Sequence, residues 1–124
     1  MAAVYSVARR FFRRAADLYF VDVQVEGEEH VPRTGPVVFA ANHPNSLMDT
    51  VLLGSRVPRN IHYLARSGLF ANPLAAATFR AAGVIPVQRA QDLGDATASG
   101  PKVENDAAFA AAFEALRAGR AVGI

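Results

Sequence analysis

The sequence contains no cysteine among its 124 residues. This absence excludes a disulfide-stabilised scaffold, a thiolate metal site and a cysteine nucleophile. The Gly-x-Ser-x-Gly motif of the hydrolase nucleophile elbow is also absent. The longest apolar run, residues 107–113, is far shorter than the roughly 18 residues that span a bilayer as a helix. Apolar residues nevertheless make up 52% of the chain, which is enough for one packed domain.

The positive charge is concentrated at the N-terminus. Residues 1–20 contain four arginines and one aspartate, whereas the rest of the chain contains nine basic and ten acidic residues. Nucleic-acid binding would use a basic patch spread over the domain, so we expect no nucleic-acid partner. A local basic segment suits a membrane surface or an acidic partner instead.

Residues 1–19 alternate apolar and basic positions with the spacing of an amphipathic helix. The apolar positions are Val4, Val7, Ala8, Phe11, Phe12, Ala15, Leu18 and Tyr19. Arginines with Asp17 fall on the other face. Such a helix can lie in a bilayer interface, with its rings among the acyl chains and its guanidinium groups at anionic headgroups. We therefore expect a membrane-interface helix whose contacts are made by Arg9, Arg10, Phe11, Phe12, Arg13 and Arg14.

Two other interpretations of this helix stay open. Its phenylalanine face can pack on the domain core instead of on lipid. Residues 9–12 also fit a twin-arginine export signal, although Asp17 and Asp22 interrupt the apolar stretch that such a signal needs.

Residues 20–124 alternate strand-like and helix-like segments. The predicted strands are residues 20–25, 37–41, 61–65 and 84–87, and the predicted helices are residues 47–53, 73–82 and 105–117. Asn72 is a candidate N-cap with proline directly after it, and Gly119 is a C-terminal stop signal. The last helix places Phe109, Phe113 and Leu116 on one face. The order predicts an α/β domain with a mostly parallel sheet flanked by helices and preceded by the N-terminal amphipathic helix.

Residues 121–124 resemble the start of a buried strand. Because a central strand rarely ends a domain, we expect the sequence to be C-terminally truncated. Residues 20–124 would then be the N-terminal part of the domain.

A polar segment, residues 42–49, directly follows the predicted strand at 37–41. Catalytic groups of α/β sheets favour the carboxyl ends of strands. A carboxylate that binds one imidazole nitrogen can orient a histidine as a general base, which makes His43 and Asp49 a candidate dyad. In one continuous helix these side chains would diverge by about 120°, so the helix must begin after His43. The alternative is a loop histidine and a surface aspartate.

The same residues carry a resemblance to a known family. Asn42-His43, Ser46 and Asp49 resemble the His–Asp motif of glycerolipid acyltransferases, which include lysophosphatidate and glycerol-3-phosphate acyltransferases. Residues 83–89, which include Gly83 and Pro86, resemble the family's second block. Residues 63–70 resemble the basic block between them, and the likeness covers about residues 19–124. Five residues separate histidine and aspartate here where four are commonest, and Arg66 replaces the family's usual lysine.

The resemblance implies a mechanism and its partners. His43 would take a proton from a hydroxyl of glycerol 3-phosphate or lysophosphatidate, and Asp49 would orient His43. The acyl group would come from acyl-CoA or acyl carrier protein, a co-substrate, with no cofactor and no metal. Arg66 and Arg89 would bind the acceptor phosphate, because the guanidinium fork matches phosphate oxygens. Either arginine can instead be an exposed structural charge. The implied place is the cytoplasmic face of the cell membrane, as a peripheral protein.

Two rival functions follow from the same residues. In this family a Pro-Glu-Gly block follows the next strand, and a chain without it would be a non-catalytic, peripheral membrane-binding fragment. A metal hydrolase would use His30, His43, His62 and Asp49, but these residues lack the spacing of metal ligands.

Overall fold

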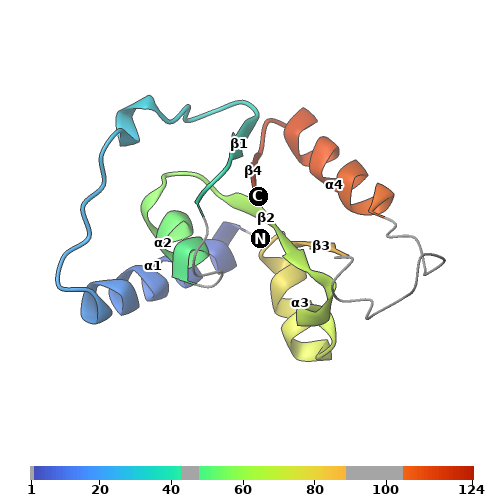
Figure 1. The fold of residues 1–124 in the computed structure, drawn as a ribbon, viewed down its shortest axis with the longest axis horizontal. Coiled ribbons are helices and arrows are strands. Elements are labelled where there is room, and N and C mark those ends of the chain that lie inside the picture. Colours follow the sequence, from blue (N-terminus) through green and yellow to red (C-terminus); the bar gives the residue numbers. More distant parts are fainter. Residues whose placement is uncertain (1, 43–47, 89–104) are drawn as a thin grey trace.

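The computed structural model describes residues 2–42, 48–88 and 105–124. A helix, α1 (Ala2–Tyr19), is followed by a short 3-10 turn, η1 (Glu28–His30), and by β1 (Val37–Phe39). The α/β region then continues through α2 (Met48–Arg56), β2 (Ile61–Arg66), η2 (Ser67–Phe70), α3 (Pro73–Ala81), β3 (Ile85–Val87), α4 (Asp106–Arg117) and β4 (Ala121–Gly123). Figure 1 shows these elements as a small sheet with helices around it.

The four described strands form one parallel sheet in the order β1-β4-β2-β3. β4, the last strand in the chain, therefore lies between β1 and β2, and all three of its residues are buried. Parallel strands covered on both faces read as short, unbroken apolar runs, as these do. The predicted α/β fold with a mostly parallel sheet, flanking helices and an N-terminal helix is confirmed.

Helices cover both faces of the sheet. On one face, Ile61 and Ala121 are buried together with Val57 and contact Leu53 of α2. On the other face, Ile85 and Val122 pack against α4. α1 lies along α2, as Figure 1 shows.

The local signals at α3 act as predicted. The Asn72 side chain accepts hydrogen bonds from the backbone N–H groups of Leu74 and Ala75, at 2.9 and 3.3 Å. Pro73 occupies the first turn, where its missing N–H group costs no helical hydrogen bond. At the end of α4, Gly119 adopts φ +71°, the left-handed conformation that ends helices.

One sequence prediction fails in the structure. Residues 20–25 form no strand, because this segment is largely exposed and pairs with no strand among the described residues. In α4, Ala108, Ala112 and Ala115 are buried against the sheet, and Leu116 packs against them. Phe109 and Phe113 are 53% and 57% exposed, since small side chains allow the helix to approach the sheet closely.

Candidate functional site

Two of the predicted site residues, Asn42 and Arg66, lie at the carboxyl-terminal edge of the sheet. Asn42 lies just after β1, and Arg66 is the last residue of β2. Because the strands are parallel, these ends face the same edge, where α/β proteins place their ligands. Asn42 and Arg66 are both exposed. His43, Ser46 and Arg89 lie outside the described residues.

Asp49 stands in the first turn of α2, as described from Met48 onward. Together with Phe39, Ala41, Tyr63 and Gly123 it lines a cavity of about 10 Å³ between the helix and the ends of β1, β4 and β2. The structure thus brings Asp49 to the sheet edge beside the chain that leads into residue 43. The cavity itself is far too small for a lipid substrate.

Tyr63 fixes this turn of α2 to the sheet. Its hydroxyl donates a 3.1 Å hydrogen bond to the backbone carbonyl of Thr50, the residue after Asp49. Burial raises the pKa of Tyr63 well above the usual 10.0, so the phenol stays neutral and keeps its donor proton. A side chain at Gly123 would lie only 2.6 Å from the Tyr63 ring, so glycine makes the space that the ring fills.

Sequence reasoning did not single out Tyr63 as a site residue. Its partner is a backbone carbonyl on another element, and such a partner has no signature in the sequence. The signal that exists is the pairing of Tyr63 with Gly123 in neighbouring strands, which becomes visible only when the sheet register is known.

Two further predicted residues, Gly83 and Pro86, have structural roles, Gly83 in the turn before β3 and Pro86 in β3 itself. Gly83 has φ +78°, and a Cβ atom there would lie 2.4 Å from Nδ1 of His62. His62 Nδ1 lies 2.9 Å from the Gly83 carbonyl oxygen. Pro86 lies in β3, an edge strand among the described residues, where a missing N–H group is tolerated. Both residues support the strand that leads toward Arg89.

α1 divides its predicted interface residues between two environments. Arg9 is half-buried and donates to the carbonyls of Ser55 and Arg56 at 3.3 and 3.4 Å, at the end of α2. The positive charge of Arg9 is stabilised there by the negative, C-terminal end of the α2 dipole. Arg56 in turn forms an ion pair with Asp17. Exposed positions of α1 comprise Arg10, Phe11, Phe12, Arg13 and Arg14.

An apolar stripe remains on the outer side of α1. It consists of Val4, Val7, Phe11 and Leu18, of which Phe11 is 66% and Leu18 is 89% exposed. The described part of the chain therefore does not pack this stripe on the core. No helix in the described ranges is long and apolar enough to cross a membrane.

The rival metal site gains no support from the described side chains. Within residues 2–42, 48–88 and 105–124, no three His, Asp or Glu side chains come together in a way that would hold a metal ion. His30 lies in η1 with Glu29 at 3.3 Å, and His62 binds the Gly83 carbonyl at the opposite end of the sheet from Asp49.

Comparisons with known proteins bear on the family of this chain. A family model described as Acyltransferase matches residues 22–124. An uncharacterised acyltransferase of Schizosaccharomyces pombe is 34% identical over 82 residues, which is 62% of this chain and 12% of the yeast protein. The chain thus spans only about an eighth of the length of that curated relative. No solved structure matches. These matches confirm the resemblance found in the sequence, and the chain belongs to the acyltransferase family.

Proposed function

We propose that this chain carries the dyad of an O-acyltransferase that moves a fatty acyl group to the hydroxyl of lysophosphatidate or glycerol 3-phosphate, in phospholipid biosynthesis. The donor is acyl-CoA or acyl carrier protein. The observation that carries the proposal is the place of Asp49. It stands in the first turn of a helix at the carboxyl edge of a parallel sheet, six residues after His43.

In the proposed reaction His43 removes the proton from the acceptor hydroxyl. The oxygen attacks the thioester carbonyl and forms a tetrahedral intermediate, which collapses to the new ester and releases the thiolate. The imidazolium of His43 returns its proton to that thiolate, so no covalent acyl-enzyme forms. Asp49 stabilises the imidazolium and selects its tautomer. Tyr63 keeps Asp49 in place through its hydrogen bond to the next residue, Thr50.

The acceptor phosphate is assigned to Arg66 and Arg89. Arg66 ends β2 at the edge that carries Asp49, and Arg89 comes two residues after β3 in the sequence. A guanidinium group binds phosphate oxygens in bidentate fashion, which suits the headgroup common to both acceptors.

A second function is favoured by the exposed stripe on α1. A peripheral membrane-binding module without catalysis would use Val4, Val7, Phe11 and Leu18 for the acyl boundary. Arg10 and Arg14 flank the stripe and would contact anionic headgroups on the cytoplasmic face of the membrane. The enzyme and the module both need this contact, but only the enzyme needs His43.

The deciding experiment measures acyl transfer and vesicle binding by the same protein. Labelled acyl-CoA or acyl carrier protein is supplied with either acceptor, and His43→Ala is compared with His30→Ala. His30 is exposed in η1, away from the sheet edge, and serves as the matched control. We expect His43→Ala to lower transfer at least 100-fold and to leave vesicle binding intact. Equal transfer by both variants refutes the dyad, and vesicle binding without any transfer by the wild type favours the module.

A further inference from the structure

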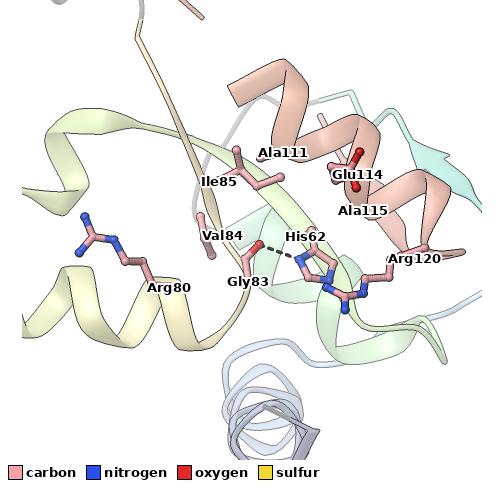
Figure 2. Close-up of a pocket in the computed structure, with 10 residues that line it drawn as sticks. His62, Arg80, Gly83, Val84, Ile85, Ala111, Glu114, Ala115 and Arg120 are labelled. Atoms are coloured by element: carbon pink, nitrogen blue, oxygen red, sulfur yellow. Dashed lines mark hydrogen bonds between the residues drawn. The ribbon is translucent and has the colours of Figure 1, made fainter. Parts of the chain in front are cut away.

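A second cavity lies at the amino-terminal edge of the sheet, opposite the edge that carries Asp49. It has a volume of about 460 Å³ and lies between α4 and the starts of β2 and β3 (Figure 2). This volume is within the range of pockets that bind small molecules. Neither Asp49 nor Arg66 is among the described residues that line it.

One wall of the cavity is apolar. Ile85 and Val84 contribute from β3 and the turn before it. Ala111, Ala115 and Ala118 face them from the C-terminal half of α4. These alanines recur at intervals of four and three residues, so they share one side of the helix. Their small side chains leave the hollow, and the wall that they form suits an aliphatic group.

The other wall carries His62 in a fixed tautomer. A carbonyl oxygen can only accept a hydrogen bond, so Nδ1 of His62 must hold the proton in its 2.9 Å contact with Gly83. This contact holds the ring between β2 and the turn before β3. The second nitrogen, Nε2, is then left for another partner, as an acceptor in the neutral ring and as a donor in the charged ring.

The charges around the cavity favour an anion. Arg120 and His62 both line the cavity, and their side chains are drawn in Figure 2. No hydrogen bond or ion pair involves the Arg120 guanidinium within the described part of the chain. Glu114, the acid at the cavity, is already paired with Arg117 at 2.8 Å. Arg80 points away in Figure 2, and its guanidinium lies 6.0 Å from the ring centre of Phe70.

We propose that this cavity binds a small organic anion with an aliphatic tail, such as a medium-chain carboxylate. The anionic group binds Arg120, which lines the cavity together with His62, because the guanidinium fork matches two carboxylate oxygens. The tail lies against the alanine side of α4. The cavity is distinct from the Asp49 site, since it lies on the face of the sheet that α4 covers, whereas α2 carries Asp49 on the other face.

The test titrates octanoate into the protein, followed by calorimetry and by the backbone amide shifts of Ala111 and Ala115. Arg120→Gln removes the cation, and Ala111→Leu fills the hollow from an exposed helix position where leucine is well tolerated. Arg33→Gln is the matched control, because this arginine is exposed and does not line the cavity. Circular dichroism confirms that each variant is folded.

We expect Arg120→Gln to weaken octanoate binding about ten- to hundredfold and Ala111→Leu to weaken it by at least as much. Arg33→Gln should leave the affinity within about twofold. Inorganic phosphate, which has no tail, should bind more weakly than octanoate and should be insensitive to Ala111→Leu. Octanoate binding unaffected by both cavity variants, or no binding at millimolar octanoate, overturns the proposal. None of these readouts needs acyl transfer, so failure here is distinct from failure of the proposed function.

Discussion

The two ends of the parallel sheet are built for different purposes. At the carboxyl end, Asn42 and Arg66 are exposed, and Asp49 begins a helix beside them. At the amino end, Arg59 and His62 bind backbone carbonyls and join neighbouring loops to the strands. The comparison teaches that polar side chains at the amino end bind backbone carbonyls, whereas those at the carboxyl end are the ones that we propose for the reaction. What separates Arg59 from Asn42 and Arg66 is burial, since Arg59 is buried and the other two are exposed.

Arg59 is the clearest example at the amino end. It is only 8% exposed, and its guanidinium donates to the carbonyls of Pro32, Gly35 and Gly119. These carbonyls belong to the segments that enter β1 and β4, while Arg59 itself precedes β2. One side chain thus fastens the starts of three adjacent strands.

The largest expected effect is at the carboxyl end. Asp49→Asn should lower kcat for acyl transfer by about 10²- to 10⁴-fold, because the amide cannot stabilise a charged His43 or hold its tautomer. Asp106→Asn is a matched control, since Asp106 also occupies the first turn of a helix that follows a strand. Steady-state kinetics of both variants provide the measurement. Similar kcat values for the two variants would break the assignment of chemistry to Asp49.

The next effect is on stability and is at the amino end. Arg59→Met should lower the free energy of unfolding by about 3 kcal/mol, because three hydrogen bonds from a charged donor are lost and buried carbonyls remain unpaired. Arg33→Met, at an exposed position of the same loop region, should change it by less than about 0.5 kcal/mol. Urea unfolding monitored by circular dichroism compares them. A loss below 1 kcal/mol for Arg59→Met would show that the three carbonyls are readily solvated.

A smaller effect is expected at Tyr63, which connects the sheet to the turn of Asp49. Tyr63→Phe should cost about 1 kcal/mol of stability, the usual value of one hydrogen bond. It should also lower kcat severalfold with little change in KM, since the helix turn loses its anchor. Tyr5→Phe is the control, because the Tyr5 hydroxyl accepts a 3.0 Å hydrogen bond from Ile61 N, not from the turn of Asp49. If both variants lower kcat alike, Tyr63 acts through stability alone.

The smallest effect concerns alkaline pH. Burial raises the pKa of Tyr63 above 10.0, so its stabilising contribution is complete below pH 10 and is lost as the pH rises further. In the unfolded chain the phenol ionises near pH 10, whereas in the fold it stays protonated. The expected loss is about 0.4 kcal/mol at pH 10 and approaches about 1.4 kcal/mol per pH unit above it. Unfolding free energies from pH 9 to 11 should therefore fall less steeply for Tyr63→Phe. Parallel pH curves for the wild type and this variant would contradict the burial of a neutral phenol.

Sequence patterns predicted most of the elements but not how the helices turn toward the core. The predicted strands at 37–41, 61–65 and 84–87 are present, with ends shifted by one or two residues. They were predictable because a short apolar run bounded by polar segments is a local sequence signal. The strand at 20–25 failed, since pairing depends on a neighbour that alternation alone cannot supply. The phenylalanines of α4 were the obvious apolar face, yet the alanines pack on the sheet.

The site shows the same division. The position of Asp49 at the strand end was predictable, because it follows from sequence order in a parallel sheet. Tyr63 and Arg59 were not predictable as anchors, since their partners are backbone carbonyls from segments 13 to 60 residues away. A carbonyl has no sequence identity, so such contacts appear only in the folded chain.

The sequence by itself determined the family, the order of strands and helices, and the segment that carries the His–Asp motif. These properties depend on residue type and short-range spacing. The tertiary structure decided which helix faces are buried, which strand lies in the middle of the sheet, and which polar groups are already satisfied. Those outcomes depend on close packing and on hydrogen bonds between distant segments. Both form only when the whole chain folds around one core.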